Sequence, residues 1–187
     1  MACVVAVALG LALGGKLSNL VGVELRGFPY IIASLVVRLA GVLLTGRVPP
    51  TVLLCTGIHV ISYGLLLYGL YLNFAIPEFR VIALGSFLNF LAIVVNGGRM
   101  PVLPRAIDPL EPSNAVLFSN TSLTHKIIDS ATRLQFLGDI FKFSFLQRTP
   151  KAFSPGDAIM VAGLISFIVR AMKGRFSSPG SHGTMGD

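Results

Sequence analysis

Long apolar runs constrain this chain of 187 residues more than any other feature. Runs of about 20 apolar residues recur, and a helix of that length crosses a hydrocarbon core about 30 Å thick. Charged residues make up 12% of the chain, where a soluble domain carries about 25%. A chain so poor in charge and so rich in long apolar segments is typical of a membrane protein. The sequence therefore predicts an all-α integral membrane protein.

The predicted spans form one bundle of about five transmembrane helices. They cover residues 2–15, 27–46, 51–73, 79–96 and 154–172. The first run reaches only about 20 Å as a helix, so the number of spans is four if that run does not cross. Short connections make neighbouring spans antiparallel. We expect a single membrane domain over residues 1–175, followed by a disordered Ser- and Gly-rich tail over 176–187.

A long segment, residues 97–153, is predicted to lie outside the membrane. Its first part is rich in proline, which favours extended chain. From Ser122 to Leu137 we predict one amphipathic helix, because apolar residues recur there at helical spacing. At its end, Ser154-Pro155-Gly156-Asp157 combines a serine cap, a proline and an acid in the first turn. This pattern predicts the start of the last span.

The charge pattern points to a membrane and away from nucleic acid. The net charge is +7, but the basic residues are spread over loops and helix ends and form no basic stripe. We expect contact with membrane lipids, a cell-membrane location, the N-terminus outside and the C-terminus in the cytoplasm. The three histidines and two cysteines show no metal-ligand spacing. We therefore expect no metal, no cofactor and no recognised catalytic motif.

Three polar residues lie within the apolar spans, namely Arg38, His59 and Asn89. Antiparallel spans place them at a similar depth, roughly 10–13 Å below one face of the membrane. In one interpretation Asn89 and His59 satisfy each other between helices. Arg38 would then pair with an acid of the long segment, Asp139 or Asp157. In the other, the three line a cavity in which Arg38 holds an anionic group, because charges in a span tend to face such cavities.

The fourth span ends at Asn96-Gly97-Gly98, for which two interpretations are open. Glycine after a helix, with proline beyond, is a common helix stop. Alternatively, the exposed amides of this stretch bind an anion. We therefore include Asn96, Gly97 and Gly98 among the candidate ligand-binding residues, with Arg38 and the other two polar residues of the spans.

Several blocks of the sequence also resemble one known family. These are the Asn-Gly-Gly-Arg-Met-Pro stretch over residues 96–101, the Phe-Leu-Gly-Asp-Ile-Phe stretch over 136–141 and the Phe-Ser-Pro-Gly-Asp stretch over 153–157. In this order they resemble a family of small bacterial multi-pass membrane proteins classed as a domain of unknown function. The resemblance implies a bacterial cell membrane and brings no known activity.

Three functions remain open from the sequence. The first is a non-enzymatic membrane protein, either an accessory subunit of a larger membrane complex or a binder of a small or lipidic anion. The second is a small transporter with its site at the level of Arg38, His59 and Asn89. The third is an enzyme acting on a lipid-linked substrate, with Asp139 or Asp157 as the acid.

Overall fold

The computed structural model describes residues 2–143 and 151–175, and this part of the chain is mostly helical. The predicted tail over 176–187 lies outside the described residues. Five longer helices dominate the structure and follow the predicted spans closely. They are α1 (Ala2–Ala12), α3 (Phe28–Leu44), α4 (Val52–Tyr71), α5 (Pro77–Val94) and α7 (Pro155–Met172), with a single turn, α2 (Ser18–Val21), after α1.

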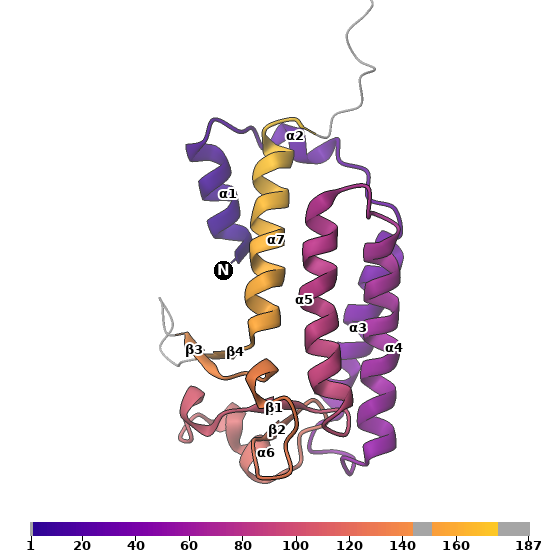
Figure 1. The fold of residues 1–187 in the computed structure, drawn as a ribbon, viewed down its shortest axis with the longest axis vertical. Helices are drawn as coiled ribbons and strands as arrows, with labels where there is room; N and C mark the ends of the chain where they lie inside the picture. Colours follow the sequence, from indigo (N-terminus) through magenta and orange to yellow (C-terminus); the bar gives the residue numbers. More distant parts are fainter. Residues whose placement is uncertain (1, 144–150, 176–187) are drawn as a thin grey trace, which may run out of the picture.

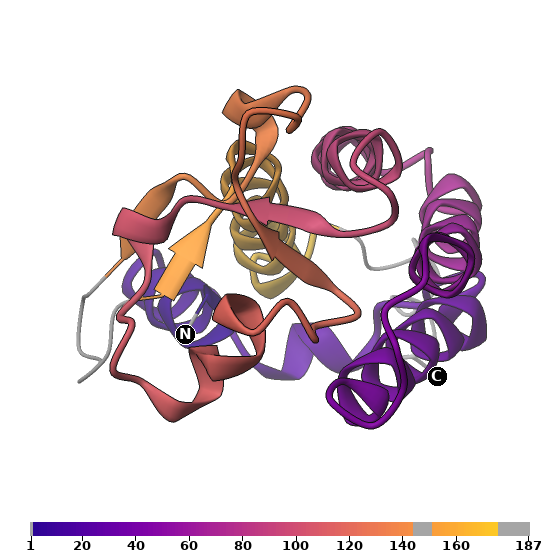
Figure 2. The same ribbon diagram turned by 90° about the horizontal axis from the view of Figure 1, so that it is seen from below.

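The five helices stand side by side in an open arc (Figures 1 and 2). Going along the arc, α1 packs on α7, α7 on α5, α5 on α4, and α4 on α3. The ends of α1 and α7 and the starts of α3 and α5 lie together at one end of the molecule. The described chain from β1 to β3, together with β4, covers the other end, which we call the loop end, and crosses the open side of the arc.

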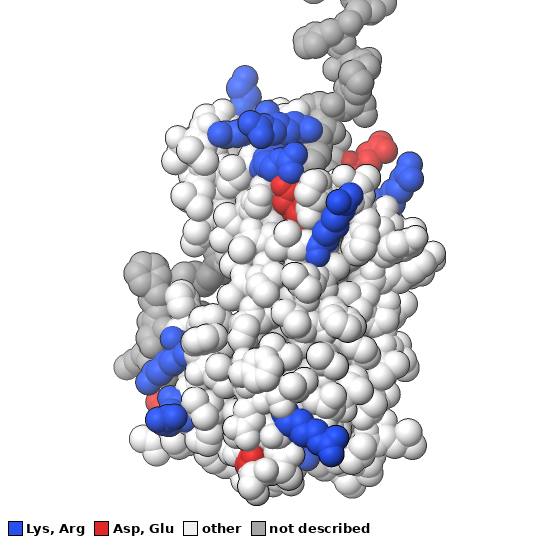
Figure 3. Space-filling view, viewed as in Figure 1, with Lys and Arg blue, Asp and Glu red and all other residues white. Residues whose placement is uncertain are grey.

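Three of the helices are long and apolar enough to cross a membrane, namely α4, α5 and α7. Two shorter apolar helices, α1 and α3, accompany them, so the expected five full spans are not established by length. With 11 residues, α1 is about 16 Å long, and the 17 residues of α3 reach about 25 Å. In Figure 3 the charged side chains gather at the two ends, with an uncharged band between.

The loop end contains two small sheets, so the prediction of a purely helical fold was wrong in detail. Strands β1 (Met100–Val102) and β2 (His125–Ile127) pair in parallel, with Met100 opposite His125. Strands β3 (Phe141–Phe143) and β4 (Lys151–Phe153) form an antiparallel pair. Short helical turns complete this end: η1 (Pro104–Ala106), η2 (Pro112–Asn114), α6 (Ala115–Phe118) and η3 (Gln135–Leu137).

The amphipathic helix predicted from Ser122 to Leu137 is wrong. Polar side chains satisfy the local amides of this segment, which competes with helix formation. The Ser122 hydroxyl accepts from the amides of Thr124 and His125. The Thr132 hydroxyl accepts from the amide of Asp129 and donates to its carboxylate. The apolar residues that mimic a helical stripe instead serve a strand and turns.

The start of α7 confirms the predicted capping pattern. The Ser154 hydroxyl accepts from the amide of Asp157 at 3.0 Å, and the Asp157 carboxylate accepts from the amide of Ser154 at 3.1 Å. Glycines then let α7 approach α5 closely, since a Cβ at Gly156 would meet the Asn89 side chain at 2.0 Å. The cap therefore fixes where α7 begins and how it sits on α5.

Candidate binding pocket at the loop end

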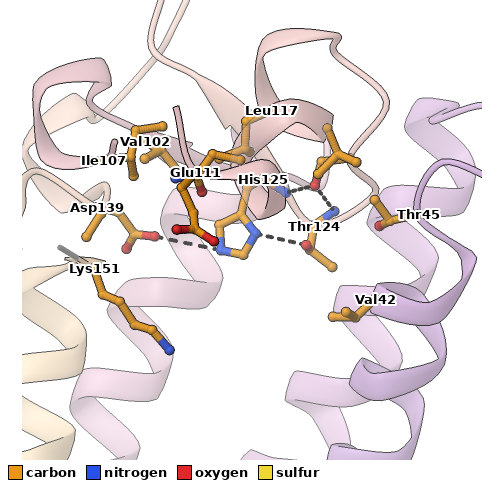
Figure 4. A pocket seen from close by; sticks show the side chains of 14 residues that line it. Val42, Thr45, Val102, Ile107, Glu111, Leu117, Thr124, His125, Asp139 and Lys151 are labelled. Carbon is orange, nitrogen blue, oxygen red and sulfur yellow. Dashed lines mark hydrogen bonds and ion pairs between the residues drawn. The ribbon is translucent and has the colours of Figure 1, made fainter. Parts of the chain in front are cut away.

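A cavity of about 340 Å³, the loop pocket, lies where the loop segment meets the end of α3 (Figure 4). Val42 of α3 and Thr45, the residue directly after α3, form one wall, and Lys151 of β4 reaches in from the opposite side, below His125. The pocket has the size of a small-molecule site. Its remaining lining residues are Val102, Ile107, Glu111, Asn114, Val116, Leu117, Ser122, Thr124, Asp139 and Ala152.

His125 is held between two polar partners. Its Nδ1 lies 2.8 Å from the Thr124 hydroxyl, and its Nε2 lies 3.7 Å from the Asp139 carboxylate. The β1–β2 pairing places His125 at this point, and Asp139 reaches it because the amide of Asp139 donates to the carbonyl of Pro101 on β1 at 2.8 Å. Two residues distant in sequence therefore meet over one short strand.

The pKa values of His125 and Asp139 are both shifted from the ordinary values of their residue types. Burial raises the pKa of Asp139 to about 7; the charge of Asp157 raises it further, and the positive charge of Arg38 opposes the shift. Burial lowers the pKa of His125, and the charges of Arg38 and His59 add to that effect. Near neutral pH, Asp139 is thus partly protonated and His125 is neutral. Such a pair can donate and accept hydrogen bonds with a polar ligand.

Arg38 lies beneath the pocket on the same face of α3 as Val42, because these two positions are four residues apart. Its guanidinium donates to the Tyr63 hydroxyl at 3.3 Å and lies 5.5 Å from the centre of that ring. In the described part of the chain Arg38 forms no ion pair with an acid. Neither Asp139 nor Asp157 is therefore its direct partner, although its charge acts on Asp139.

His59 is fully buried in α4 and does not contact Asn89 through a hydrogen bond. Its Nδ1 lies 2.9 Å from the carbonyl of Cys55, and its ring stacks on Tyr63 with the centroids 6.3 Å apart. Its Nε2 has no hydrogen-bond partner among the described residues. His59 and Arg38 thus meet through a shared tyrosine, which the sequence interpretation had not included.

The Asn89 side chain is hydrogen-bonded to the start of α7. Its amide nitrogen donates to the Asp157 carboxylate at 2.8 Å, and its oxygen accepts from the Ser154 hydroxyl at 2.8 Å. Asn89 therefore joins α5 to α7, as the interhelical interpretation expects, but with different partners. Asp157 is likewise used by this network and by the helix cap.

The Asn96-Gly97-Gly98 stretch adopts the helix-stop arrangement. Gly97 and Gly98 have φ values of 70° and 78°, and their amides donate to the carbonyls of Val94 and Ile93. The Asn96 side chain exchanges two hydrogen bonds with the backbone of Arg133, at 2.8 and 2.9 Å. The amides suggested for anion binding are thus used by the protein itself.

Sequence reasoning missed several residues of the pocket. The sequence shows no metal-ligand spacing around His125, and no motif marks Lys151, Glu111 or Thr124 as binding residues. The β1–β2 pairing places His125 at the pocket, and a three-residue strand leaves no clear periodic signal in the sequence. Glu111 and Lys151 reach the same pocket from other parts of the loop end. The distant ion pair of Glu78 with Arg170, which joins α5 to α7 at the other end, was also missed.

Fold and site together define an apolar helical bundle whose polar pocket lies at one end, above a cluster of buried polar side chains. The chain belongs to a family of unknown function (DUF5317), whose sequence profile matches residues 22–169. No curated protein and no solved structure matches the chain.

Proposed function

We propose that this chain is a multi-pass membrane protein in which α3, α4, α5 and α7 cross the bilayer and α1 enters it without crossing fully. The lengths of α4, α5 and α7 and the uncharged band support this arrangement. The loop end lies outside and the C-terminal end of α7 in the cytoplasm. The amide of Gly46 donates to the carbonyl of Thr121, which keeps the α3–α4 connection and the loop segment on one side.

Cysteine accessibility tests this topology. Single cysteines at Val48, Ile76 and Leu110, in a background lacking the two native cysteines, are treated with a membrane-impermeant maleimide in intact cells. Val48→Cys and Leu110→Cys are expected to react from outside, and Ile76→Cys only after permeabilisation. Labelling of positions 48 and 110 from opposite sides would contradict the topology.

We further propose that the protein binds the anionic head group of a lipidic amphiphile in the loop pocket. The observation that carries this proposal is the position of the pocket, with polar groups directly beyond the end of the apolar helix α3. Head groups lie at that level of a membrane. Lys151 lines the pocket, and the positive charge of Arg38 acts on the pocket residue Asp139. A protonated Asp139 can donate a hydrogen bond to an anion.

Lipid retention tests the head-group site. The full chain is purified in mild detergent, and bound lipid is measured by native mass spectrometry. Lys151→Gln is expected to lose most of an anionic lipid that the wild type retains. Lys142→Gln is the matched control, because Lys142 lies on the facing strand of the same hairpin and does not line the pocket. Equal loss in both variants would refute a pocket-specific site.

The same purification tests the accessory-subunit alternative. If the chain serves a larger complex, purification from native membranes yields partner proteins in fixed ratio to it. If it acts as a lipid binder alone, anionic lipid accompanies it and the partner proteins are absent.

A second candidate function is an enzyme acting on a lipid-linked substrate. The placement of Asp139 and Thr124 on opposite sides of His125 favours it, because a carboxyl with a pKa near 7 suits a general acid. Incubation with labelled lipid phosphoesters tests this function. Asp139→Asn should abolish turnover while anionic lipid is still retained; turnover that persists in that variant would exclude Asp139 as the acid.

A further inference from the structure

A second, apolar cavity lies next to the loop pocket. This cavity, the α1–α7 groove, measures about 510 Å³ and runs between α1, the first half of α7 and the β3–β4 hairpin. Its lining is apolar apart from Lys151 and Asp157 at the loop end. α1 contributes Ala2 and Val5 to the lining, and α7 contributes Ala158, Val161, Ala162 and Ile165.

The groove follows the axis of α7 into the apolar band. From Asp157 to Ile165 the helix rises about 12 Å. Ala158 and Ala162 lie four residues apart on the same face, so their small side chains leave open a strip along the helix. Phe143 and Phe153 of the hairpin close the loop end. The groove therefore offers a strip of apolar contacts along α7 to a slender apolar chain.

The groove and the loop pocket meet at the same two residues. Lys151 and Ala152 of β4 line both cavities. A molecule in one cavity is therefore adjacent to the other, with a lysine at the junction between the polar part and the apolar part. This order of polar pocket, cation and apolar groove matches the order of chemical groups in an anionic lipid.

We propose that one anionic lipid occupies both cavities, with its head group in the loop pocket and one acyl chain in the α1–α7 groove. The proposal rests on the proposed head-group site and adds the class of ligand. Acyl chains in the bilayer are already in an apolar medium, so the groove gains packing rather than a hydrophobic driving force. Retention of the lipid therefore depends on both parts: the head group contributes through its charge, and the acyl chain contributes through its packing in the groove.

The test uses the full chain in nanodiscs of phosphatidylcholine with a small share of phosphatidylglycerol that carries a photoactivatable group in one acyl chain. After irradiation, adducts are mapped by peptide mass spectrometry. Adducts are expected on the first residues of α1 and on the α7 stretch from Ala158 to Ile165. Adducts spread evenly over the exposed helix faces would overturn the proposal.

Filling the groove gives the matched comparison. Ala162→Phe places a large ring in the groove and is expected to lower the adducts on α7 about fivefold or more. Ala40→Phe makes the same change at an exposed position of α3 outside the groove and should leave them unchanged. Equal effects of the two variants, or none from Ala162→Phe, would refute the groove as the chain site.

A soluble head-group probe separates the two proposals. Binding of glycerol 3-phosphate to the detergent-solubilised protein is measured by calorimetry. It is expected to be lost in Lys151→Gln and kept in Ala162→Phe, whereas retention of the long-chain lipid is lost in both. If Ala162→Phe retains the long-chain lipid while Lys151→Gln loses it, the groove proposal fails and the head-group site stands. If Lys151→Gln retains both ligands, the head-group site itself fails.

Discussion

Replacement of Asp139 by Asn should stabilise the protein at alkaline pH. The pKa of Asp139 is raised from its ordinary value of 3.8 to about 7, chiefly by burial, and its side chain is only 11% exposed. The folded state therefore binds the proton more tightly than the unfolded chain does. The protonated Asp139 carboxyl makes its full contribution to the free energy of unfolding below about pH 4, and this contribution is lost as the pH rises through about 7.

The size of the effect follows from the two pKa values. At about 1.4 kcal/mol per tenfold change in proton affinity, full ionisation in the folded state costs about 4 kcal/mol. Between about pH 5 and about pH 8 the part lost is about 2–3 kcal/mol. Asparagine resembles the protonated acid in shape and charge, so Asp139→Asn removes this pH-dependent cost.

The assay is unfolding of the detergent-solubilised protein by a denaturing detergent, for the wild type and Asp139→Asn, at about pH 5 and about pH 8. The stability of the variant relative to the wild type should rise by about 2–3 kcal/mol between the two pH values. Comparison with the wild type at each pH cancels groups that both chains share, among them His125, whose lowered pKa acts in the opposite direction. A relative stability that stays constant or falls with pH would refute the raised pKa.

Three further predictions concern the packing of the helices, and thermal unfolding in detergent measures each. Gly98→Ala should destabilise the protein by about 3 kcal/mol or more, because the new Cβ would lie 2.2 Å from the amide of Thr56; Gly14→Ala, also at positive φ but in open space, should cost only about 1 kcal/mol. Glu78→Gln removes the buried carboxylate that pairs with Arg170 and should cost about 2 kcal/mol, and an unchanged melting temperature would show that the pair contributes nothing. Asn89→Ala removes two hydrogen bonds to the start of α7 and should cost about 1–3 kcal/mol; a loss no larger than that of an exposed asparagine would contradict the network.

The helices were predictable from the sequence because apolar length and proline position determine them directly. Proline at the start of α5 and the Ser154 cap of α7 act on their own neighbours, so the sequence patterns indicate them well. The predicted bounds 51–73 and 154–172 differ from those of α4 and α7 by at most two residues at either end. Such signals depend only on residues close in the chain.

The loop end was not predictable in the same way. The pairing of β1 with β2 joins residues 25 positions apart, and each strand has only three residues. The stretch after Ser122 carries apolar residues at helical spacing, yet its side-chain hydrogen bonds and the left-handed conformation of Leu134 exclude a helix. His125 could be recognised as a pocket residue only once its strand partner was known.

The interpretation of the mid-span polar residues needed correction for a related reason. The prediction grouped Arg38, His59 and Asn89 by their expected depth, but depth alone does not decide which helix faces meet. Rotation of α4 brings Tyr63 between Arg38 and His59, whereas Asn89 turns to α7. A one-residue rotation of a helix moves a side chain by about 100°, which boundaries known to two residues cannot resolve.

Small residues on one face of α7 explain why a groove exists at this place. Ala158 and Ala162 lie four residues apart on α7, with Val5 of α1 also lining the groove, and their short side chains leave a strip open along the helix. Phe143 of β3 and Phe153 of β4 line the loop end of that strip with aromatic rings. If the groove serves to hold an acyl chain, replacing both Ala158 and Ala162 by leucine should fill the strip and lower lipid retention while raising thermal stability. Higher stability with unchanged retention would instead mark the groove as a packing defect beside a head-group site.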